Sequence, residues 1–171
     1  MIFVTSIEKA SRSCASGLSI VLCACFLFWL VGLSHVKAGD RDDEVLGIVA
    51  AHEKQINDIA SKLWHYSELG FLEEKSTRLL KDVLNAEKFR ITENAAGLST
   101  AFVAEWGNGK PVVGIIAEFD ALPGPRQDIL PQHVSVPGQS GTHACGHNLF
   151  GAASTVAAIA VKKWLKKNGQ P

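Results

Sequence analysis

An uncharged apolar block near the N-terminus decides which part of the chain is free to form a globular domain. The block runs from Leu18 to Leu33, follows the basic residues Lys9 and Arg12, and precedes small residues at Val36 and Ala38. A basic start, a short apolar stretch and small residues at the end are typical of an export signal. The block is also shorter than the roughly 20 residues of a membrane-spanning helix.

We therefore expect residues 1–38 to be a cleaved signal peptide and the protein to be secreted or periplasmic. The alternative is a protein anchored in the membrane by an uncleaved N-terminal segment. After cleavage only Cys145 would remain of the four cysteines, so the processed chain could form no internal disulfide.

The composition of the chain fits a globular domain that does not bind nucleic acid. Lys plus Arg and Asp plus Glu are both 17, which gives a net charge of zero and no basic excess for a phosphate backbone. Hydrophobic residues make up 47% of the chain, which is enough for a core.

The hydrophobic pattern predicts an α/β fold with a partial mixed sheet flanked by helices. The Asn108-Gly109 pair is a strong signal for a β-hairpin, and the continuous apolar run after it suggests a strand buried on both faces. The expected elements are helices over 45–63 and 73–86, a strand over 89–92, hairpin strands over 100–106 and 112–117, an irregular segment over 121–142, and a final helix from 148, capped by Asn148, to Gly169.

Asp120 follows the end of the predicted strand 112–117, where ligands bind in open α/β sheets. A carboxylate at the end of a buried strand is costly unless a positive group faces it, and a metal ion or a metal-bound histidine would serve. The alternative is an aspartate that only forms a turn before Pro123.

Cys145 and His147 stand one residue apart at the start of the final helix. A thiolate and an imidazole are both good zinc ligands. If the loop is extended, residues i and i+2 project to the same side and can reach one small volume. Two alternatives remain open on spacing alone: Cys145 as a buried structural thiol, or as the nucleophile of a thiol hydrolase assisted by His143 and Asn148.

Two longer stretches resemble the metal-dependent amidohydrolases, a metallopeptidase-like family that includes hippurate hydrolase and aminobenzoyl-glutamate hydrolase. They are the segments 114–124, GIIAEFDALPG, and 141–151, GTHACGHNLFG, and the segments 64–74 and 158–165 are also similar. The resemblance implies that residues 39–171 are the N-terminal portion of a di-metal, aminopeptidase-like catalytic domain, truncated and without the lid or dimerisation domain of the family.

The resemblance also implies a site with two divalent metals, manganese or zinc, that cleaves amide bonds in N-acyl amino acids or aminobenzoyl-glutamate. Cys145 and His147 match metal ligands, and Asp120 matches a catalytic-site carboxylate that orients a ligand histidine. Full-length members are expected to be homo- or hetero-oligomers. Because a catalytic zinc site needs about three protein ligands, we expect this chain alone to be inactive. A non-catalytic half-domain that binds metal or pairs with another chain is the alternative.

Overall fold

The computed structural model describes residues 2–6 and 38–170, and the expected signal peptide lies almost entirely outside them. It confirms a mixed α/β domain. Its helices and strands are β1 (Ile2–Ser6), α2 (Ala38–Ala50), α3 (Glu53–Tyr66), α4 (Glu74–Ala86), β2 (Arg90–Glu93), the short helix η1 (Ala95–Gly97), β3 (Phe102–Trp106), β4 (Val112–Ile116), β5 (Leu122–Pro123), β6 (Gly141–Thr142) and α5 (His147–Lys167). None of the helices described has the length and apolarity needed to cross a bilayer.

The main sheet has the strand order β2-β3-β1-β4, so β3 and β4 are not neighbours. The N-terminal strand β1 lies between them, parallel to β3 and antiparallel to β4. The predicted hairpin is therefore wrong. The Asn108-Gly109 pair lies in the connection between β3 and β4, whereas the pairing partner of both strands comes from the other end of the chain.

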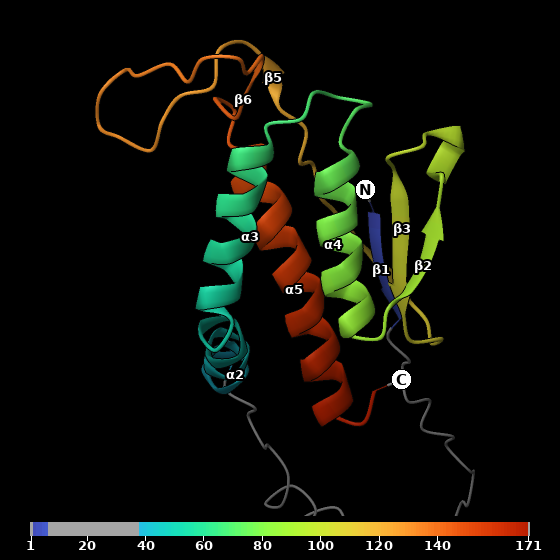
Figure 1. Ribbon diagram of the computed structural model, residues 1–171. Coiled ribbons are helices and arrows are strands. Elements are labelled where there is room, and N and C mark those ends of the chain that lie inside the picture. The colour runs from blue at the N-terminus through green and yellow to red at the C-terminus, as the bar shows by residue number, and fades with distance from the viewer. Residues whose placement is uncertain (1, 7–37, 171) are drawn as a thin grey trace, which may run out of the picture.

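Helices α3, α4 and α5 lie on one face of this sheet, and the core lies between these helices and the strands (Figure 1). Leu63 of α3, Leu80 of α4 and Ile159 of α5 are fully buried and belong to one apolar cluster with Phe102 of β3. Each of these helices buries one stripe of apolar residues, as expected for an amphipathic helix. The packing of α3 against α5 fixes the start of α5, where the sequence motifs lie.

Strand β4 is mostly exposed, which contradicts the expectation of a strand buried on both faces. Val112 and Ile116 are 55% and 58% exposed, whereas Ile115 packs against the core. Successive side chains of a strand point to opposite faces, and the described helices cover only one face (Figure 1). In addition, β4 is at the edge of the sheet. A continuous apolar sequence therefore does not by itself show that a strand is buried on both faces.

The single helix expected over 45–63 is divided into α2 and α3. The break falls at His52, whose backbone leaves the helical region with φ −108° and ψ 9°. His52 Nδ1 contacts the carbonyl oxygen of Ile48 at 2.7 Å, and its Nε2 contacts Lys163 of α5 at 2.7 Å. The helix therefore ends where a side chain links it to a distant element, which the periodicity of apolar residues does not reveal.

The segment 121–142 begins and ends in short β structure against the C-terminal end of α3. Strands β5 and β6 pair, and the Ala121 N–H donates to the carbonyl oxygen of Glu68 at 2.7 Å. A Cβ atom on Gly141 would lie 1.9 Å from the carbonyl oxygen of Ser67, so only glycine fits there. This contact holds the end of the loop, and the turn that follows it, against α3.

Candidate metal and substrate site

His147 is the best-positioned chemical group among the residues that the sequence singled out. Its Nδ1 lies 2.9 Å from Asp120 Oδ1 and 3.1 Å from the Asp120 carbonyl oxygen. Both partners only accept hydrogen bonds, so Nδ1 carries the proton and Nε2 is the ring nitrogen left for another partner. A carboxylate that fixes the tautomer and orientation of a histidine in this way is the usual support of a metal-binding imidazole.

A close contact between α5 and the segment after β4 brings His147 to Asp120. Gly151 lies one helical turn after His147, on the same face of α5. A Cβ atom on Gly151 would lie 2.9 Å from Cβ of Phe119, so the helix packs almost directly on the backbone of this segment. Because Gly151 has no side chain, α5 comes close enough for His147 to contact Asp120.

Glu118 completes this group, although no pattern in the sequence had singled it out. Its Oε2 lies 3.2 Å from His147 Nε2, and its side chain is half exposed. Glu118 and Asp120 are two residues apart at the end of β4, a spacing that places two side chains on one side of an extended segment. That Glu-x-Asp spacing is the sequence signal that could have identified Glu118.

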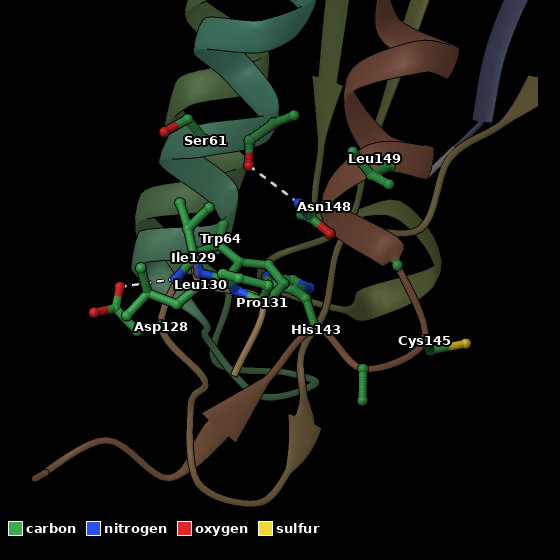
Figure 2. A pocket seen from close by; sticks show the side chains of 13 residues that line it. Ser61, Trp64, Asp128, Ile129, Leu130, Pro131, His143, Cys145, Asn148 and Leu149 are labelled. Atoms are coloured by element: carbon green, nitrogen blue, oxygen red, sulfur yellow. Dashed lines mark hydrogen bonds between the residues drawn. The ribbon is translucent and has the colours of Figure 1, made fainter. Parts of the chain in front are cut away.

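Cys145 lies in the turn that precedes α5. The thiol is exposed, and Figure 2 shows its sulfur pointing away from Trp64 and the loop residues that face it. The chain between His143 and Gly146 forms a turn, with the Gly146 N–H donating to the His143 carbonyl oxygen at 2.9 Å, and Gly146 has φ 85°. A turn therefore replaces the extended loop expected from the Cys-x-His spacing.

Two further expectations at the start of α5 differ from the structure. Asn148 does not cap the helix: Gly146 is the N-cap residue, and the Asn148 side chain donates to the carbonyl oxygen of Ala60 at 3.3 Å. Among the described residues, Cys145 makes no hydrogen bond to a histidine. His143 donates from Nε2 to the Leu63 carbonyl oxygen at 2.9 Å, and His147 faces carboxylates, so the geometry does not support a Cys-His nucleophile.

The donor atoms fit a divalent metal in chemistry but not in number. His147 Nε2 and Glu118 Oε2 are 3.2 Å apart, close to the about 3.4 Å between two ligands of one tetrahedral zinc ion. Asp120 Oδ1 is already engaged by Nδ1. Across residues 38–170, no three His, Cys, Asp or Glu side chains are arranged to hold an ion. The described part of the chain thus supplies two donors where a catalytic zinc needs about three.

A cavity of about 680 Å³ lies beside the turn 143–146 (Figure 2). It is bounded by α3, by the loop residues 128–131 and by the start of α5. Its lining residues are Ala60, Ser61, Trp64, Asp128, Ile129, Leu130, Pro131, His143, Ala144, Cys145, Gly146, Asn148 and Leu149. Asp120 and Glu118 line a separate, smaller cavity of about 270 Å³.

Burial lowers the pKa of His143 from its ordinary value near 6.5, and the hydrogen bond to the Leu63 carbonyl only partly opposes this effect. Because the folded-state pKa is depressed, the unfolded chain takes up the proton first as the pH falls. The stability supplied by the neutral ring is fully present above the unfolded pKa of about 6.5. It is lost as the pH falls below that value and through the folded-state pKa.

We therefore expect acid to destabilise the wild type more than the His143→Gln variant, whose amide can still donate to Leu63. The measurement is urea unfolding at about pH 7.5 and about pH 5.5, compared as a difference of unfolding free energies. The exposed His65 provides the control, because His65→Gln should leave that difference unchanged. An equal loss of unfolding free energy in the wild type and in His143→Gln would show that the His143 ring does not contribute to the pH dependence of stability.

Sequence comparison shows that the chain is similar to known amidohydrolases. It is 43% identical over 124 residues to a subunit of the p-aminobenzoyl-glutamate hydrolase of Escherichia coli (strain K12), a match that covers 71% of this chain and 26% of that protein. It is 34% identical over 106 residues to N-acetylcysteine deacetylase of Bacillus subtilis (strain 168), covering 61% of this chain and 27% of that protein.

A third relative, YhaA of Bacillus subtilis (strain 168), is described as an amidohydrolase. It is 34% identical over 103 residues, which is 60% of this chain and 24% of that protein. The chain thus spans about a quarter of the length of each of these relatives. No family model matches the chain.

Proposed function

We propose that this chain belongs to a metal-dependent hydrolase that cleaves the amide bond of N-acyl amino acids, with aminobenzoyl-glutamate as the first substrate to test. The observation that carries the proposal is the position of His147 between Asp120 and Glu118. The 43% identity to a protein named for aminobenzoyl-glutamate hydrolysis supports the choice of substrate.

In this proposal His147 binds the metal through Nε2, and Asp120 orients the ring through Nδ1. Cys145, two residues before His147, and Glu118, beside Nε2, are the other metal ligands proposed from this chain. A bound divalent metal, manganese or zinc, would polarise the amide carbonyl and activate a water molecule. The site of the whole enzyme would hold two such ions.

We further propose that this chain alone does not turn over substrate, because the three ligands proposed from it are too few for two catalytic metal ions. Secretion or export to the periplasm, with residues 1–38 removed, is part of the same proposal. A second candidate is a half-domain that pairs with another chain, and the exposed Val112 and Ile116 of β4 favour it.

The test is metal binding by the full chain, measured by calorimetric titration with manganese or zinc, together with an assay on aminobenzoyl-glutamate and N-acetyl amino acids. We expect His147→Ala to abolish most of the binding. Asp120→Ala should weaken it by about 10- to 100-fold, because the orienting hydrogen bond is lost. His65→Ala is the matched control, since His65 is an exposed histidine of α3 outside the site.

Unchanged metal affinity in His147→Ala would overturn the proposed metal site. Turnover by this chain that disappears in Cys145→Ala would overturn the proposed inactivity and show that the site is complete within 171 residues. Hydrolysis that persists in a metal chelator would point to an amidohydrolase of a different mechanism.

A further inference from the structure

Helix α2 buries less apolar surface than α3, α4 and α5, so its polar contacts matter more. No residue from Asp43 to His52 is buried, and the apolar residues Val45, Ile48 and Val49 are only partly covered. The helices α3, α4 and α5 each contain apolar residues that are fully buried. Because most of the stability of a helix in a protein comes from packing of its apolar face, α2 is the helix whose docking depends most on single polar contacts.

The His52 side chain links α2 to α5 in one protonation state only. Its Nδ1 lies 2.7 Å from the carbonyl oxygen of Ile48, which can only accept a hydrogen bond. Its Nε2 lies 2.7 Å from Nζ of Lys163, which can only donate. Nδ1 therefore carries the proton and Nε2 offers its lone pair, so the ring is neutral. A protonated ring would point an N–H group at the lysine ammonium group, and the two positive charges would repel each other.

Two carboxylates stand near this contact, and both keep their charge in mild acid. Glu87, after α4, lies 3.6 Å from Lys163, and Glu44 of α2 pairs with Lys167 of α5 at 2.6 Å. Burial raises the pKa of Glu87, but the hydrogen bonds and charges of the neighbouring lysines outweigh it and hold the pKa below its ordinary value. The Lys167 ammonium group lowers the pKa of Glu44. Since histidines change charge between about pH 5 and pH 8, His52 is the group of this contact that responds to mild acid.

We propose that His52 is a pH-sensitive latch: α2 is docked on α5 while the ring is neutral and is released when the ring takes up a proton. The docked state binds fewer protons than the released state, so a fall in pH favours release. Figure 1 shows α2 at the end of the helices opposite β5 and β6. His147 begins α5 and lies about 24 Å along its axis from Lys163. Release of α2 therefore does not require the candidate metal site to change.

The test is hydrogen exchange of the full chain at about pH 7.5 and about pH 5, followed by mass spectrometry. The results are compared as protection factors, which correct for the pH dependence of exchange itself. Peptides covering 43–50 report on α2, and peptides covering 74–86 report on α4. In acid, we expect the protection of α2 to fall about fivefold more than that of α4, which is the contribution of one hydrogen bond. The α4 peptides separate release of α2 from a loss of global stability.

Two substitutions test the two sides of the contact. His52→Gln keeps an acceptor for Lys163 but cannot take up a proton, so the additional loss of α2 protection in acid should disappear. Lys163→Met removes both the donor and the positive charge, so α2 should be less protected already at about pH 7.5 and respond no further to acid. His65→Gln is the matched control, because the His65 ring contacts the carbonyl oxygen of Ser61 at 2.6 Å, just as His52 contacts Ile48 four residues earlier. That variant should keep the pH response of α2.

A loss of α2 protection in acid that is as large in His52→Gln as in the wild type would overturn the latch. Equal changes in α2 and α4, or an α2 that is unprotected already at about pH 7.5, would overturn it as well. The exchange measurement needs neither metal nor substrate, so its outcome is independent of the proposed hydrolase function.

Discussion

Replacing Gly141 with alanine is expected to destabilise the protein by about 3 kcal/mol, the upper part of the usual range for overpacking a tight contact. The added Cβ would lie 1.9 Å from the Ser67 carbonyl oxygen and 3.2 Å from Cβ of Ala121. The nearest atom belongs to the backbone at the end of α3, where Ser67 already has a left-handed conformation with φ 44°. The contact cannot be relieved by a side-chain rotation, so β6 has to move away from α3.

The measurement is the free energy of unfolding from urea titration, with Gly47→Ala as the control. Gly47 lies in α2 with nothing within 4 Å of the position of a Cβ, so alanine there should stabilise the helix by about 0.5–1 kcal/mol. A Gly141→Ala variant as stable as the wild type would show that β6 does not pack against α3 as described.

Replacing Val4 with proline is expected to remove the backbone protection of both neighbouring strands. Val4 is the middle residue of β1, paired with Glu105 of β3 and Gly114 of β4. Proline cannot donate to a ladder and is not tolerated in central strands. With the loss of one ladder hydrogen bond, or about 1 kcal/mol, amide exchange in the neighbouring strands should accelerate by about fivefold.

Hydrogen exchange followed by mass spectrometry on peptides covering 102–116 measures this effect. Val4→Ile keeps the N–H group and the β-branched side chain, so it should leave the exchange rates unchanged. Exchange in α3 serves as an internal reference for global stability. If β3 and β4 exchange at the same rate in Val4→Pro as in the wild type, β1 is not the central strand of the sheet.

The helices of this fold follow closely from the sequence, whereas the strand pairing does not. Apolar residues at helical spacing identify α4 and α5, because each helix buries one stripe against the sheet. A strand, by contrast, needs a partner, and nothing near Phe102 or Val112 in the sequence indicates that residues 2–6 separate them. Local sequence patterns do not show which distant strands pair with each other.

The candidate site was predictable in part. Asp120 and His147 were both singled out, and the structure brings them within 2.9 Å across 27 residues of sequence. The Cys-x-His spacing assumes an extended backbone, whereas Gly146 takes a left-handed conformation and turns the chain between Cys145 and His147. Glu118 was missed because a single carboxylate beside Asp120 has no periodic or motif signal until the position of His147 is known.

The place of β1 has a consequence for the proposed removal of residues 1–38. Strand β1 is enclosed by β3 and β4 and pairs with both of them. Cleavage after residue 38 would take β1 out of the sheet and leave β3 and β4 without the partner that they share. The four-stranded sheet is therefore a feature of the uncleaved chain alone.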